Sequence, residues 1–216
     1  MKKHIQRILA AAAAILLTAG ISSCQHEPST DGLNNQFTVQ TTRDDKADFA
    51  GIMTYFLPDK ILRMEGNKTS DWTDDNAQQI LTAVADCMND YGYTPEAEKT
   101  AAQAGLQLTY IERTTYYASW NNPYWSSGYW GYWDGWYYPF PALYGFSSGT
   151  LLIEMVDLRP SSTVLEGRAN KLPVIWRAFI SGLLTGSQRI NIDRTVEAVD
   201  QAFAQSPYLD KNPSIR

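Results

Sequence analysis

The sequence has few of the residues on which most hydrolytic and metal-dependent active sites rely. It contains two histidines, His4 and His26, and two cysteines, Cys24 and Cys87. Because both histidines precede the part of the chain that can fold, a Ser-His-Asp or Cys-His arrangement is excluded there. The spacings of a zinc site, a Walker loop and a dinucleotide-binding glycine fingerprint are missing as well. We therefore predict that the protein is not an enzyme and that it binds no metal and no cofactor.

Catalysis by a pair of carboxylates is not excluded by this composition. A glycosidase needs two carboxylates placed across a cleft, whereas adjacent pairs are usually solvated surfaces or helix caps. Glu154 and Asp157 would also lie on opposite faces of a strand if side chains alternate. A weak glycan hydrolase is therefore the alternative to a non-catalytic protein. The pairs are Asp44–Asp45, Asp74–Asp75, and Glu154 with Asp157.

Positive charge is also scarce, with 18 lysines and arginines against 23 aspartates and glutamates and a net charge of −5. Three of the basic residues, Lys2, Lys3 and Arg7, lie in the first 23 residues, so the rest of the chain carries −8. An acidic domain lacks the basic patch with which proteins bind nucleic acid. We expect no nucleic-acid partner.

The apolar run over residues 8–19 is too short for a permanent transmembrane helix. It would span about 18 Å at about 1.5 Å per residue, whereas a hydrocarbon core is about 30 Å thick. A short basic segment precedes the run, and this order is typical of a removable signal peptide. We predict that residues 1–23 are such a signal.

The motif Ile21-Ser22-Ser23-Cys24 follows the run and resembles the bacterial lipobox, an aliphatic residue and two small residues before a Cys. Cys24 is therefore expected to carry lipid, which makes a membrane a partner of the protein. Residues 24–36 form a polar tether with little to bury. Gln25 stands where an Asp can favour inner-membrane retention in bacterial lipoproteins. We therefore expect an outer-membrane lipoprotein that faces the periplasm.

The rest of the chain predicts one α+β domain over residues 37–207 and a loose tail at 208–216. Its single sheet is expected to be mixed or mostly antiparallel, with two main helices packed on one face and a long aromatic loop. Extended structure is expected over residues 37–57, 105–117, 149–158 and 163–171, the last two as a hairpin.

Two helices carry capping signals. Asp74 or Asp75 is expected to cap a helix that runs to about Tyr91 and ends at Gly92. Asp193 is expected to cap a second helix that ends near residue 207. Between the strands and this last helix, residues 173–186 are apolar and ambiguous, and we interpret them as a short helix.

Cys87 lies on the apolar face of the first predicted helix, at helical spacing from Ile80, Val84 and Tyr91. A catalytic thiolate would need a nearby histidine and a cationic setting. We therefore predict that Cys87 is a buried, inert thiol.

Three segments carry a family resemblance. They are Ala47-Asp48-Phe49 with the nearby Thr54-Tyr55 and Pro58, the helix end Tyr91-Gly92-Tyr93, and residues 149–157 followed by 165–169. Together they resemble the bacterial lipoprotein family called domain of unknown function 4136, over residues 40–207. The family often has Asp where Glu154 stands. The resemblance implies an envelope lipoprotein, and it supplies no catalytic residues.

Residues 116–146 form an unusual segment, in which 15 of 31 residues are aromatic and Asp134 is the only charged one. Glycines and prolines break any long helix or strand, and a loop of this length is uncommon without a role. The residues proposed as the binding surface are Trp120, Tyr124, Trp125, Tyr129, Trp130, Tyr132, Trp133, Trp136, Tyr137 and Tyr138.

Trp and Tyr are enriched at protein interfaces and membrane boundaries because they have one apolar and one polar end. The segment is therefore expected to contact the membrane surface, an envelope protein or a glycan such as peptidoglycan. The alternative is that its rings fold back on one another as a satellite core. We predict a protein that binds or scaffolds in the cell envelope, with a cell-wall glycan binder as the second interpretation.

The lipid anchor is directly testable. Replacing the lipidated thiol in Cys24→Ala removes the acceptor of the lipid, so the protein should leave the membrane fraction or stay unprocessed. Membrane fractionation and the mobility of the processed chain measure this. A Cys24→Ala chain that is processed normally and remains in membranes would contradict the assignment.

Overall fold

The computed structural model describes residues 37–65, 68–113, 136–137, 139, 149–159, 171–186 and 189–212. These residues form a mixed β-sheet and two long helices. No helix among them is long and apolar enough to cross a membrane. The strands are β1 (Thr38–Arg43), β2 (Thr54–Phe56), β3 (Ile61–Glu65), β4 (Lys68–Trp72), β5 (Thr94–Pro95), β6 (Ala104–Arg113), β7 (Trp136–Tyr137), β8 (Thr150–Asp157) and β9 (Leu172–Ser181).

The main sheet runs in the order β1-β9-β8-β6 and then forks. One half of β6 pairs with β2, which pairs with β5, and the other half pairs with β3, which pairs with β4. The β1–β9, β9–β8, β8–β6 and β3–β4 pairs are antiparallel, whereas β6–β2, β6–β3 and β2–β5 are parallel. The predicted mixed α+β architecture is confirmed.

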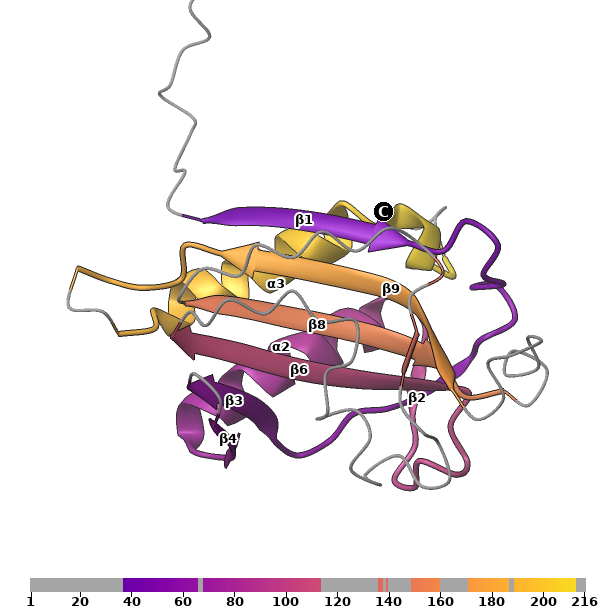
Figure 1. Ribbon diagram of the computed structural model, residues 1–216. Helices are drawn as coiled ribbons and strands as arrows, with labels where there is room; N and C mark the ends of the chain where they lie inside the picture. The colour runs from indigo at the N-terminus through magenta and orange to yellow at the C-terminus, as the bar shows by residue number, and fades with distance from the viewer. Residues whose placement is uncertain are drawn as a thin grey trace, which may run out of the picture. The chain divides into compact units, whose positions relative to one another are not determined.

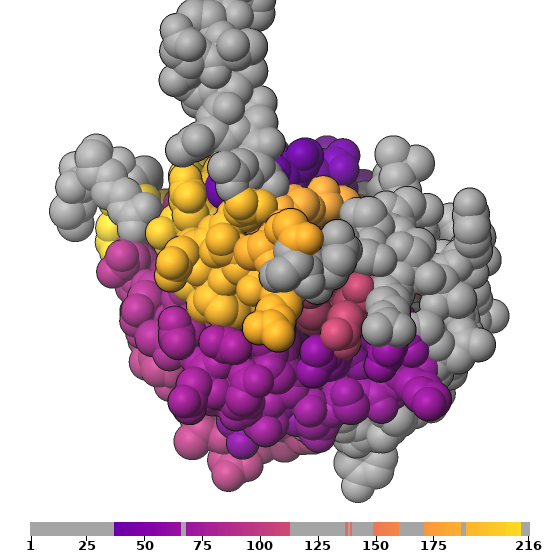
Figure 2. Space-filling model, turned by 90° about the vertical axis from the view of Figure 1, so that its left-hand side faces the viewer, coloured from indigo at the N-terminus to yellow at the C-terminus, as the bar shows by residue number. Residues whose placement is uncertain are grey.

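The two helices, α2 (Asp75–Asp90) and α3 (Ile192–Ala204), lie together behind the sheet (Figure 1). Their mutual contact can be followed in Figure 2, where the yellow C-terminal part meets the purple part. Asp74 caps α2 by accepting a hydrogen bond from the N–H of Ala77, and Gly92 ends it with a φ of +86°. These helix ends match the prediction, as does the placement of both helices on one face.

The cap of α3 differs from the prediction by two residues. The side chain of Asn191 accepts a hydrogen bond from the N–H of Arg194 at 3.0 Å. Asp193 instead lies in the first turn, where its negative charge still favours the positive end of the helix dipole. Asn and Asp are equally good capping residues, so sequence alone does not distinguish them here.

The core lies between the helices and the sheet, and Trp176 is its largest fully buried side chain. Its indole N–H donates to the hydroxyl of Ser206 at 2.9 Å, and its ring lies 5.3 Å from that of Phe203. A buried aromatic side chain of this size removes about 200 Å² from water, which contributes about 5 kcal/mol at about 25 cal/mol per Å². The buried indole therefore stabilises the fold through its apolar area, and its N–H group has a hydrogen-bond acceptor.

The partner of β8 in its hairpin is β9, not the predicted strand at 163–171, most of which lies outside the described residues. The expectation of a short helix over residues 173–186 is wrong, because Leu172–Ser181 is a strand. Almost every side chain of β9 is buried. A strand buried on both faces lacks the alternation that marks a half-buried strand, and its apolar run resembles a buried helix.

Two further elements differ from expectation. The polar stretch before residue 72, for which no element was predicted, forms the β3–β4 hairpin, in which Ile61 faces Trp72 in register. The tail is also ordered beyond residue 208, where η4 (Pro207–Leu209) buries Leu209 completely. The backbone N–H of Lys211 then donates to the carbonyl of Tyr91 at 3.0 Å. The predicted loose tail is therefore wrong for residues 208–212.

Gly149 offers a test of the entry into β8. Its φ is +73°, and an added Cβ would lie 2.3 Å from the Cγ of Leu184. A left-handed conformation costs a non-glycine residue about 1–2 kcal/mol, and the close contact adds to it. We expect Gly149→Ala to lower the free energy of unfolding by about 2 kcal/mol or more, measured by urea denaturation.

The matched control is Gly186→Ala, because nothing lies within 4 Å of the Cβ added there. We expect this control to change the free energy of unfolding by less than about 0.5 kcal/mol. Equal losses in the two variants would show that Gly149 is not specifically required.

Candidate functional site

The aromatic segment meets the described structure at β7. Trp136 and Tyr137 pair in parallel with Leu172 and Pro173 at the start of β9, and Tyr137 is half-buried. The pairing attaches the segment to a central strand of the domain. The other members of the predicted binding surface lie outside the described residues, as does Cys24; they are Trp120, Tyr124, Trp125, Tyr129, Trp130, Tyr132, Trp133 and Tyr138.

A buried polar row crosses the sheet on the face away from the helices. Gln107 of β6 lies directly opposite Glu154 of β8, and Glu154 lies directly opposite Arg177 of β9. The exposed fractions of the three residues are 6%, 0% and 6%. Side chains directly opposite on neighbouring strands have Cβ atoms about 4.5–5.5 Å apart. The register therefore places the carboxylate between an amide and a guanidinium.

Sequence reasoning noticed Glu154 as a carboxylate and overlooked Arg177. The available signal was a single charged residue within each of two apolar runs, residues 150–156 and 172–180. A buried charge is costly unless it is paired. Two opposite charges in apolar strands therefore predict that the strands are neighbours and that the charges lie close together. The register also puts Asp157 opposite Ala104, a core residue. Glu154 and Asp157 thus occupy opposite faces of β8.

Asp157 takes part in an ion cluster at the end of β8. The Arg159 guanidinium donates to Asp157 at 2.8 Å and to Asp48 at 3.2 Å. The N–H of Gly51 donates to the other oxygen of Asp48 at 3.0 Å. This backbone hydrogen bond and Arg159 lower the pKa of Asp48. A Cβ on Gly51 would lie 2.2 Å from Asp48 Oδ2, so a larger residue there would displace the Asp48 carboxylate.

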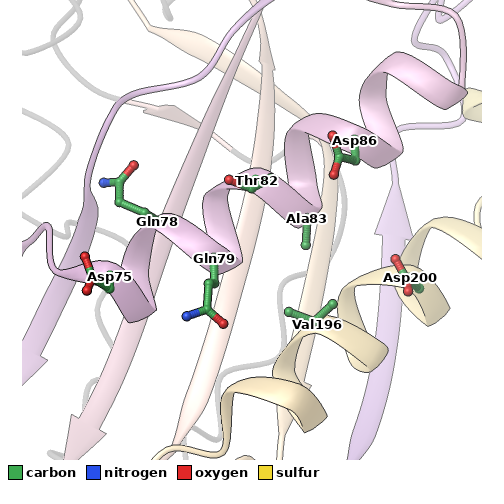
Figure 3. Close-up of a pocket in the computed structure, with 8 residues that line it drawn as sticks. All are labelled: Asp75, Gln78, Gln79, Thr82, Ala83, Asp86, Val196 and Asp200. Carbon is green, nitrogen blue, oxygen red and sulfur yellow. The ribbon is translucent and has the colours of Figure 1, made fainter.

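A groove of about 730 Å³ lies between α2 and α3 on the layer opposite the polar row. Ala83 and Val196 point toward one another between the helices, while Asp86 and Asp200 stand further along the same seam (Figure 3). In the part of the chain that the structure describes, no group of three or more His, Cys, Asp or Glu side chains is placed to hold a metal ion. Three aspartates, Asp75, Asp86 and Asp200, give the groove an acidic lining.

Cys87 lies beside this groove. Its thiol is half-buried rather than fully buried as predicted, and it donates to Asp200 Oδ1 at 3.4 Å. Burial, followed by the Asp200 carboxylate, raises the pKa of the Cys87 thiol to about 12. Since the thiolate is the nucleophile, this environment gives an unreactive cysteine.

The family model of the domain of unknown function DUF4136 matches residues 39–208, and the chain belongs to this family. The solved structure of a DUF4136 family protein from Bacteroides thetaiotaomicron is 38% identical, with a TM-score of 0.70, over 82% of this chain and 98% of that chain.

A PelC dodecamer from Paraburkholderia phytofirmans aligns at 14% identity and a TM-score of 0.38, over 78% of this chain and 95% of that chain. No curated protein matches the sequence significantly. The resemblance drawn from the three sequence segments is confirmed, and the family assigns no molecular activity.

The reactivity of Cys87 tests this part of the structure. At pH 8 we expect a polar thiol reagent to label the Cys87 peptide about 100-fold more slowly in the native protein than in urea, because the raised pKa suppresses the thiolate. Asp200→Asn removes a neighbouring negative charge, which lowers the Cys87 pKa and should speed native labelling. Native labelling at the unfolded rate would refute the assignment of an inert thiol.

Proposed function

We propose that this protein is a lipid-anchored, non-catalytic protein of the cell envelope that binds a partner protein through the aromatic segment 116–146. The observation that carries the proposal is the pairing of Trp136 and Tyr137 with the start of β9. It attaches a segment rich in Trp and Tyr to a rigid strand of the domain. Aromatic side chains held on a rigid element are the usual centres of protein interfaces.

The composition of the segment supports the same proposal. Asp134 is its only charged residue, whereas the rest of the mature chain is acidic. A nearly uncharged aromatic surface can be desolvated at an interface at low cost, because few charges lose their water. The long acidic surface of the helices is less suited to this, since each carboxylate would need a partner.

The lipobox-like motif supports the cellular setting. Cys24 as the lipid acceptor and residues 25–36 as the tether would hold the domain beside a bilayer. Gln25 after the Cys favours the outer membrane, and the domain is proposed to face the periplasm. The partner is then an envelope protein within reach of the tether.

The test replaces residues 116–134 with a short Gly/Ser linker and retains β7. The entropy of closing a connection rises only slowly with its length, and the core between helices and sheet has its own apolar residues. We expect a folded protein with a melting temperature close to that of the parent, and loss of crosslinks to envelope proteins in cells. The matched control, Gln78→Ala with Gln79→Ala on α2, should keep every crosslink because the helix surface lies on another layer.

The outcomes separate the alternatives. If the shortened chain unfolds, the segment is a satellite core. If it folds and all protein crosslinks persist, the segment does not bind a protein. Loss of binding to purified peptidoglycan instead would indicate a glycan binder, and loss of flotation with vesicles by a lipid-free chain would indicate a membrane contact.

A further inference from the structure

β1 is an edge strand. It pairs with β9 along its whole length, from Thr38 opposite Ser181 to Arg43 opposite Trp176, without a bulge. No other strand in the described part of the chain pairs with the opposite edge of β1, and Figure 1 shows β1 at the margin of the sheet. A six-residue strand is about 20 Å long at about 3.3 Å per residue.

The register shows which backbone groups point outward. The N–H of Asp44 donates to the carbonyl of Ile175 at 2.9 Å, and this pair continues the β1–β9 register. In an antiparallel pair, hydrogen-bonded and non-hydrogen-bonded residues alternate. The even-numbered residues of β1 therefore bond to β9. The N–H and C=O groups of Val39, Thr41 and Arg43 point away from the sheet.

This edge lacks the features with which natural proteins block strand pairing, such as proline, a bulge or an inward charge. Residues 38–42 are uncharged, and four of the five are β-branched. The single charge, on Arg43, is held by Asp45 at 3.0 Å and lies 4.1 Å from the centre of the Tyr208 ring. The edge is therefore regular, nearly neutral and rich in residues that favour strands.

We propose that this edge pairs with β1 of a second copy of the chain, antiparallel, so that the two sheets become one. Only the outward-facing residues can bond, and the same alternation makes Phe37, directly before β1, a fourth outward-facing residue. Of the registers that pair outward-facing residues, the one with the longest ladder places Gln40 opposite Gln40 of the partner subunit. Val39 then faces the partner's Thr41, and Thr38 faces the partner's Thr42. Both are favourable cross-strand pairs.

The composition of β1 favours a second copy as the occupant, because the antiparallel register sets β-branched residues of the two strands against one another. The chain carries a net charge of −5, so two copies repel each other over most of their surfaces. In the proposed register no like charges lie opposite one another, because Arg43 faces the partner's Phe37. With Phe37 included, the outward residues of both strands form four hydrogen-bonded pairs and about eight backbone hydrogen bonds, and the two-fold symmetry satisfies both edges at once.

The experiment introduces Gln40→Cys into the full chain in membranes. Gln40 and the partner's Gln40 form a non-hydrogen-bonded pair, with Cα atoms about 4.5 Å apart, within the range of about 4.4–6.8 Å for a disulfide. Mild oxidation should give a covalent dimer on a non-reducing gel. The matched control is Thr38→Cys, on the same face but opposite the partner's Thr42, which should give at least tenfold less. The unmodified chain measures the background from Cys24 and Cys87.

A second variant addresses the backbone. Adding Thr41→Pro to Gln40→Cys removes an outward N–H and leaves the bonds to β9, as prolines at sheet edges do. We expect the crosslink to fall at least tenfold while the melting temperature changes little. Equal crosslinking of Gln40→Cys and Thr38→Cys, or a crosslink that survives Thr41→Pro in the folded protein, would overturn the proposal. The dimer does not depend on segment 116–134, so the linker variant should crosslink like its parent.

Discussion

The three central strands are buried on both faces, and the rest of the structure depends on this constraint. Every residue of β8 is buried, as are nearly all of β9. Since α2 and α3 cover one face, the buried polar residues of β6, β8 and β9 gather on the other. The register places Glu154 between Gln107 and Arg177. A slip of one residue in β9 would move Arg177 into the helix-side core.

The same slip would remove Trp176 from its hydrogen bond to Ser206 and its contact with Phe203. The two faces of β9 therefore fix its register independently, one by the buried guanidinium that lies opposite Glu154 and one by the indole of Trp176. Burying an unpaired charge costs several kcal/mol, and losing a large aromatic contact costs about 3–5 kcal/mol. Either is comparable with the whole stability of a small domain, about 5–15 kcal/mol.

The residues that carry the family resemblance prove to be structural. Asp48 accepts hydrogen bonds from Gly51 and Arg159 and joins the loop after β1 to the end of β8. Gly92 ends α2 in a left-handed conformation. The carbonyl of Tyr91, just before it, accepts the N–H of Lys211. These contacts stabilise the fold, and the proposed binding surfaces lie elsewhere.

The sequence predicted α2, β6 and β8 because each has a clear periodicity of apolar residues or a clear helix cap. It missed β9 because burial on both faces removes the alternation, and the β3–β4 hairpin because only Ile61 and Trp72 are buried in it. The ordered tail was missed because its one deeply buried residue, Leu209, lies among polar residues. Composition drew attention to the aromatic segment, whereas only register could show that β7 pairs with β9.

The open edge of β1 gains significance from its place in the chain, directly after the proposed tether. About eight hydrogen bonds at a net of about 0.5–1.5 kcal/mol each stand against an association cost of about 4–15 kcal/mol, so pairing in dilute solution is marginal. Lipid anchors on Cys24 would confine both copies to one surface, which raises their effective concentration without a new contact. Confinement and edge pairing thus reinforce each other, and the uncharged edge is where two acidic copies can meet without opposing like charges.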